Sequence, residues 1–94
     1  MTPEGKLQKR IIDFLEKQQW LYCLKLIKTN KNWIADVAVF VWDWKMFFIE
    51  IKTEKWVISE LQLFRQKELQ KLWYEYLIPK GFEDFVTKFM KLNF

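Results

Sequence analysis

Residues 47–52, Phe-Phe-Ile-Glu-Ile-Lys, decide the fold, because they hold two charged side chains within a run of apolar, β-preferring residues. Side chains alternate along a strand, so Glu50 and Lys52 share one face of the predicted strand. The residues of its opposite face are Phe47, Ile49 and Ile51. A second apolar run, residues 34–42, holds one acid, Asp36. Such runs are typical of central strands that are covered on both faces.

The two strands are close enough in sequence to pair through Asp43-Trp44, a turn position where Asp-Gly is expected. Asp36 and Glu50 then lie opposite or diagonal to each other. Two carboxylates so placed repel unless a cation lies between them. Carboxylates with phosphate oxygens suit Mg²⁺. The alternative is that Glu50 and Lys52 form a solvent-facing pair on an edge strand, with Asp36 as an acid at a strand start.

The remaining periodicity predicts the element order α-β-β-β-α-β-α. Apolar residues at helical spacing predict helices over 3–19, 60–72 and 82–89. Alternation and turn residues predict strands over 20–28, 34–42, 46–52 and 74–78. We expect an α/β (α+β) fold, a central mixed sheet flanked by helices, in a single domain over 1–94. The apolar residues expected on one face of the second helix are Leu61, Phe64, Leu69 and Leu72.

Composition limits the chemistry. The chain has one cysteine, Cys23, and no histidine, which excludes an internal disulfide, a cysteine-based zinc site and His-dependent nucleophilic catalysis. The net charge of +4 gives a mild bias toward anionic partners. Charged residues interrupt every apolar run, and the first ten residues are polar. We therefore expect no membrane span, no signal peptide and a cytoplasmic protein.

Four short elements occur in order along nearly the whole chain. They are Glu4, Trp33-Ile34-Ala35-Asp36, Glu50-Ile51-Lys52 and Ser59-Glu60-Leu61-Gln62. Their order and spacing resemble the virus-type replication-repair nuclease (VRR-NUC) domain of the PD-(D/E)xK, restriction-endonuclease-like superfamily. The pattern of that family is a first-helix Glu, Gly-x-Pro-Asp, a strand Glu-x-Lys, and Ser-x-x-Gln opening the next helix. The chain departs from it at Ala35, in place of Pro, and at Trp33, in place of Gly.

The resemblance implies a metal-dependent DNA endonuclease that hydrolyses phosphodiester bonds. Asp36 and Glu50 would ligate Mg²⁺ or Mn²⁺, and the backbone carbonyl of Ile51 would be a further ligand. Lys52 would orient and polarise the attacking water.

Two further residues have implied roles that their positions alone leave open. Glu4 would complete or tune the metal shell; otherwise it is an acid favoured in the first turn of a helix. Gln62 would place water or phosphate; otherwise it is a solvated polar residue.

The implied partner is DNA, with branched or junction DNA as an expected substrate in phage or mobile-element replication or repair. We expect basic residues to line a phosphate groove, unless they form a solvated face. The residues expected there are Lys9, Arg10, Lys31, Lys55 and Arg65. Two other functions stay open: a non-catalytic nucleic-acid-binding or scaffold module on the same fold, and a protein-interaction domain that uses exposed tryptophan.

Aromatic residues are also numerous enough to supply an interface, and a chain of 94 residues has little surface to hold a duplex alone. We therefore expect a C₂ homodimer. The candidate interface residues are Trp20, Phe82, Phe85, Phe89 and Phe94.

The balance of glycine and tryptophan is unusual, with two Gly and six Trp. Four tryptophans stand where the family pattern or turn chemistry places glycine: Trp33, Trp44, Trp56 and Trp73. One hypothesis is that these rings supply core and stacking surface. The other is that their codons were translated as Trp although the natural source inserts Gly.

Overall fold

The computed structural model describes residues 2–31, 34–52 and 59–92, and the predicted order α-β-β-β-α-β-α holds over these ranges. The helices are α1 (Pro3–Glu16), α2 (Glu60–Lys71) and α3 (Phe82–Met90). The strands are β1 (Leu21–Lys25), β2 (Val37–Val41), β3 (Lys45–Ile49) and β4 (Glu75–Leu77). Within these ranges no helix is long and apolar enough to cross a membrane.

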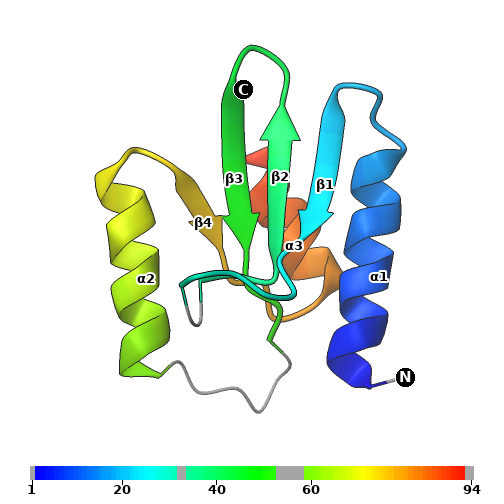
Figure 1. Ribbon diagram of the computed structural model, residues 1–94. Coiled ribbons are helices and arrows are strands. Elements are labelled where there is room, and N and C mark those ends of the chain that lie inside the picture. Colours follow the sequence, from blue (N-terminus) through cyan, green and yellow to red (C-terminus); the bar gives the residue numbers. More distant parts are fainter. Residues whose placement is uncertain (1, 32–33, 53–58, 93–94) are drawn as a thin grey trace.

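The strands form a four-stranded sheet in the order β1-β2-β3-β4 (Figure 1). The pairs β1–β2 and β2–β3 are antiparallel, and β4 lies parallel to β3. Because parallel neighbours need a crossover, α2 connects β3 to β4. The α+β fold with a mixed sheet is confirmed, and β2 and β3 are its central strands.

Each face of the sheet carries an apolar cluster. Helices α1 and α3 cover one face, where Leu15 and Phe85 pack with Val39, Phe47 and other residues of the main core. The other face has a smaller cluster around Ala35, Ala38, Phe48 and Tyr76, with Leu69 of α2 against it. Figure 1 shows α1 beside β1 and α2 beside β4, at opposite sides of the sheet.

Most of the elements are shorter than the sequence pattern predicts, except α3, which extends one residue further, to Met90. Helix α1 ends at Glu16 because a turn follows, in which the N–H of Leu21 donates to the carbonyl of Gln18 (3.2 Å). Strand β1 therefore covers 21–25 and not 20–28. Strand β2 begins at Val37 and β3 ends at Ile49, so the predicted acids lie just outside the strands.

The exposure of apolar side chains does not follow from their spacing alone. Leu61 and Phe64 of α2 and the capping residue Leu72 are exposed, because this helix lies at the edge of the sheet, and Leu69 packs against the smaller cluster. The expectation that Phe85 and Phe89 lie at an interface is wrong. Phe85 and Phe89 belong to the main core and have no surface to offer a partner. The Phe82 ring packs edge-on against Phe14, with 5.6 Å between ring centres, while Phe94 lies outside the described residues.

Candidate functional site

Asp36 and Glu50 face each other at one end of the central strand pair. The β2–β3 register ends with the pair Val37 and Ile49, and Asp36 and Glu50 are the next residues beyond it. The N–H of Asp36 donates to the carbonyl of Ile49 (3.0 Å), which is one residue out of this register, so the regular ladder ends here and the two acids lie next to each other just beyond it. The N–H of Ile51 donates to Oδ2 of Asp36 (2.6 Å), which fixes this carboxylate against the chain after β3. The sequence prediction placed this pair correctly.

Glu50 is buried, with 6% of its surface exposed, and its N–H donates to the carbonyl of Leu77 (2.9 Å). Burial, together with the neighbouring Asp36 carboxyl, raises the pKa of the Glu50 carboxyl to about 8. The alternative of a solvent-facing pair on an edge strand is therefore wrong, because β3 is a central strand and Glu50, which directly follows it, is buried.

Lys52 and Glu4 act on Glu50 through their charges. The ammonium of Lys52 lowers the pKa of Glu50, whereas the carboxylate of Glu4 raises it. Glu4 is exposed in the first turn of α1. In Figure 1 the N-terminal end of α1 and the C-terminal end of β3 lie at the same end of the sheet. The fold thus brings Glu4 into electrostatic range of the pair.

Gln62 is buried at the start of α2, not solvated. Its Oε1 accepts from the N–H of Ser59 (3.1 Å), while its own N–H donates to Oγ of Ser59 (3.1 Å), which forms a capping box. Within the described part of the chain, Nε2 of Gln62 has no hydrogen-bond partner, although the side chain is only 5% exposed. A buried donor without a partner is rare and indicates a missing acceptor, such as water or a phosphate oxygen.

Tyr76 also belongs to this site, and the sequence analysis missed it. Its hydroxyl donates to the carbonyl of Ile34 (2.6 Å), two residues before Asp36. Burial raises the pKa of Tyr76, and the charges of Glu50 and Asp36 raise it further, so the hydroxyl lies near both carboxylates. The available signal was a tyrosine within a strand of apolar residues, where its hydroxyl needs a partner.

The donor set fits a hard divalent cation. Among the described residues no group of three or more His, Cys, Asp or Glu gathers as ligands, so Glu4 does not join a three-carboxylate cluster. Mg²⁺ commonly takes one or two carboxylates and completes its shell with waters and substrate phosphate. Asp36 and Glu50, with the carbonyl of Ile51, would provide such a partial shell, and a cation would offset the burial and the repulsion that raise the pKa of Glu50.

Three of the basic residues predicted to contact DNA already have partners in the protein. Lys9 pairs with Asp13 (2.8 Å), and Arg65 with Glu68 (2.8 Å). The Arg10 guanidinium lies 4.0 Å from the centre of the Phe82 ring. Lys31 is exposed, and Lys55 lies outside the described residues.

Solved structures share this architecture. A structure described as "VRR_NUC domain" matches over 99% of this chain and 100% of its own, with a TM-score of 0.87 and 19% sequence identity. A second, described as "VRR_NUC domain protein", matches over 97% and 88%, with a TM-score of 0.72 and 14% identity. No protein-family model and no curated protein matches the sequence. The chain thus has the fold of these VRR_NUC domain structures.

Proposed function

We propose that this protein is a metal-dependent deoxyribonuclease that hydrolyses phosphodiester bonds, with Asp36 and Glu50 as ligands of Mg²⁺ or Mn²⁺. The observation that carries the proposal is a buried glutamate next to a second acid, on a fold shared with VRR_NUC domains. An uncompensated buried charge destabilises a fold, so a chain with no use for a cation there gains nothing from the pair.

The side chains around the pair have separate roles. A bound divalent cation supplies Lewis acidity toward a phosphoryl oxygen and lowers the pKa of a bound water. Asp36, held by the Ile51 N–H, orients one ligand oxygen, and Glu50 supplies the other. Lys52 holds and polarises the attacking water. Glu4 tunes the negative potential of the site.

Gln62 is the proposed positioning donor for the substrate. Its Oε1 is occupied by the cap of α2, which leaves Nε2 to donate to a phosphate oxygen or to water. This use accounts for an amide that is otherwise buried without a partner.

The proposed substrate is DNA, including branched DNA such as junctions, in phage or mobile-element replication or repair. Lys9, Arg10, Lys31, Lys55 and Arg65 are proposed to contact phosphates. The ion pair of Lys9 is exposed, so Lys9 can exchange a carboxylate for a phosphate at little cost.

We also propose a homodimer that uses the face of β1 and β2 opposite to the main core. Its outward residues are apolar and exposed: Tyr22, Leu24, Phe40 and Trp42, with Trp20 beside them. These outward positions carry no charge, so the surface suits a second copy of itself better than a polyanion.

The test of the nuclease proposal is a panel of labelled linear, nicked and branched DNAs incubated with Mg²⁺ or Mn²⁺. Lys52→Ala is expected to slow cleavage by about 10²-fold or more, since one electrostatic group in an active site contributes this much. DNA affinity measured in Ca²⁺ is expected to change little, because binding rests on many phosphate contacts. Cleavage by Lys52→Ala at the wild-type rate would contradict the role of Lys52. DNA binding without cleavage by the parent protein would leave the non-catalytic DNA-binding module as the function.

A further inference from the structure

Tyr76 connects β4 to the segment that carries Asp36. The ring of Tyr76 stacks on Phe48 of β3, with 6.4 Å between ring centres, and its hydroxyl reaches past β3 to the carbonyl of Ile34 (2.6 Å). Ile34 and Asp36 precede β2, so this segment lies outside the regular strand pairing. The hydroxyl therefore holds the backbone just before a candidate ligand.

We propose that Tyr76 is a positioning residue of the site: its hydroxyl holds the backbone before Asp36 at the spacing that a divalent cation requires. This inference rests on the proposed function. Partners that orient metal ligands typically affect metal affinity as strongly as some ligands do. Tyr74, on the same side of Phe48, offers a matched comparison, because its ring packs edge-on against Phe48 at 5.9 Å between ring centres.

The experiment compares Tyr76→Phe and Tyr74→Phe with the parent protein in a Mn²⁺ titration that measures free Mn²⁺. Tyr76→Phe is expected to weaken Mn²⁺ binding about tenfold, whereas Tyr74→Phe binds as the parent does. Circular dichroism at the titration temperature shows that each variant is folded. Parent-like Mn²⁺ affinity in Tyr76→Phe would overturn the positioning role. A parent protein that binds no Mn²⁺ would instead overturn the proposed function, and this inference with it.

A separate observation concerns two tryptophans with left-handed backbone. Among the described residues, those other than glycine with positive φ are Asp43 (65°), Trp44 (64°) and Trp73 (71°). Left-handed residues at the tip of a β-hairpin are typically Gly, Asn or Asp, because a bulky side chain disfavours this backbone. Asp43-Trp44 occupies that tip, between β2 and β3.

Trp73 occupies the corresponding glycine position at the end of α2. The N–H of Tyr74 donates to the carbonyl of Leu69 (3.1 Å), and the N–H of Trp73 to that of Gln70 (2.9 Å). These two bonds form a Schellman motif, whose left-handed residue is usually glycine.

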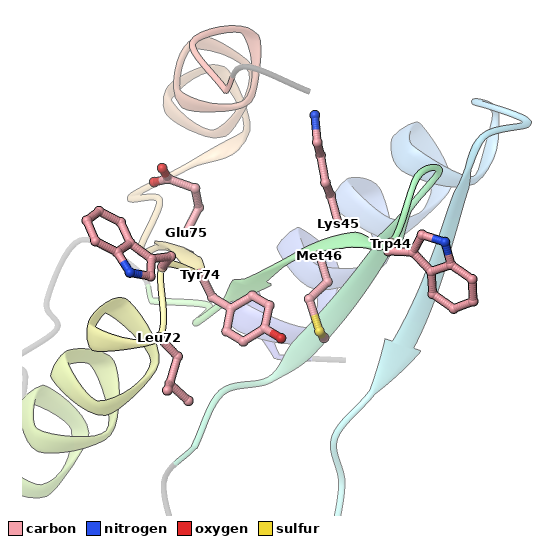
Figure 2. Close-up of a pocket in the computed structure, with 7 residues that line it drawn as sticks. Trp44, Lys45, Met46, Leu72, Tyr74 and Glu75 are labelled. Carbon is pink, nitrogen blue, oxygen red and sulfur yellow. The ribbon is translucent and has the colours of Figure 1, made fainter.

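Neither indole ring compensates for this backbone by packing. Trp44 is 99% exposed and Trp73 is 94% exposed. Both residues line a cavity of about 390 Å³. Tyr74 and Leu72 lie on the opposite side of this cavity from Trp44, and the Trp44 ring points away from them (Figure 2). A bulky side chain in the left-handed region without contacts is destabilising and has no visible use.

We infer that positions 44 and 73 are glycine positions, and that the natural chain carries glycine there. Trp44 and Trp73 then arise from codons translated under a code that differs from that of the source. Of the hypotheses for the four tryptophans, this one accounts for both described positions. Trp33 and Trp56 lie outside the described residues.

Thermal unfolding of paired variants tests this inference. At positions 44 and 73, the glycine variant is expected to exceed the alanine variant in Tm by about 4 °C or more, because alanine keeps the Cβ that left-handed backbone disfavours. At Leu72, exposed and with a φ of −92°, the order reverses and alanine is the more stable. Alanine equal to or above glycine at 44 and 73 would overturn the inference, as would tryptophan found there in peptides of the protein from its natural source.

Discussion

Glu50 illustrates, at the scale of one residue, the conflict between stability and function. Its carboxyl is buried opposite Asp36, so its pKa lies near 8 where an exposed glutamate has an ordinary acidic value. Such a group is tolerated in a fold when a cation or a substrate uses it. Replacing Glu50 with glutamine, its neutral isostere, should therefore stabilise the fold and abolish the candidate metal site.

Glu50→Gln is expected to raise Tm in the absence of metal at pH 8.5, where Glu50 carries its charge. The gain in free energy of unfolding should be roughly 1–3 kcal/mol, the cost of an uncompensated buried polar group. The same variant should lose the increase in Tm that Mn²⁺ gives the parent protein. Calorimetry with and without Mn²⁺ measures both effects, and Glu75→Gln on the exposed part of β4 serves as control. A lower metal-free Tm for Glu50→Gln would contradict this view of the site.

The residues of the site were predictable to different degrees. Side-chain alternation within 47–52 and the pairing of two consecutive strands suffice to place Asp36 near Glu50, since a hairpin is a local structure. Gln62 is readable because a capping box has a fixed spacing from Ser59. Tyr76 was predictable only as a strand tyrosine whose hydroxyl needs a partner. Its contact with Ile34 depends on the parallel pairing of β4 with β3, and no local pattern specifies that pairing.

At the scale of elements, α3 contains the clearest pH-dependent contact outside the site. The hydrogen bond from Lys88 lowers the pKa of Asp84, and the N–H of Lys80 lowers it further. A carboxyl whose pKa is depressed by folding contributes stability above its unfolded pKa and loses it as pH falls through the folded pKa. About a third of the Asp84 side chain is exposed, so solvent screens the pair and its contribution is modest.

Asp84→Asn is therefore expected to lower Tm at pH 7 by a few degrees at most, and to leave it unchanged near pH 2. Thermal unfolding followed by circular dichroism at the two pH values gives the comparison. Glu83→Gln changes an exposed acid in the same helical turn and should have the smaller effect. A deficit of Asp84→Asn that persists at pH 2 would show that the hydrogen bonds of Asp84 act independently of its charge.

Element boundaries and exposure were harder to predict than element order. Helix α2 has apolar residues at helical spacing, yet Phe64 and Leu72 are exposed, because the helix packs on the short edge strand β4 and not across the sheet. The pattern records which residues are apolar, whereas burial depends on how much surface the neighbouring element offers.

At the scale of the molecule, the uncovered face of β1 and β2 determines the expected assembly. Phe40→Lys places a charge at the centre of this face and should convert a dimer to a monomer, measured by light scattering at tens of micromolar. Leu63→Lys on α2 is a matched control, because both parent side chains are 41% exposed. A monomeric parent protein would count against the dimer, and so would a dimer that persists in Phe40→Lys.

Single-turnover cleavage of labelled DNA in Mn²⁺, by the parent protein and by Asp36→Asn, tests the central claim most directly. Asp36→Asn keeps an acceptor for the Ile51 N–H but loses the charge that a cation needs. The account predicts cleavage by the parent protein and a loss of about 10²-fold or more in Asp36→Asn. No cleavage by the parent on any DNA of the panel, or equal rates for the two proteins, would contradict it.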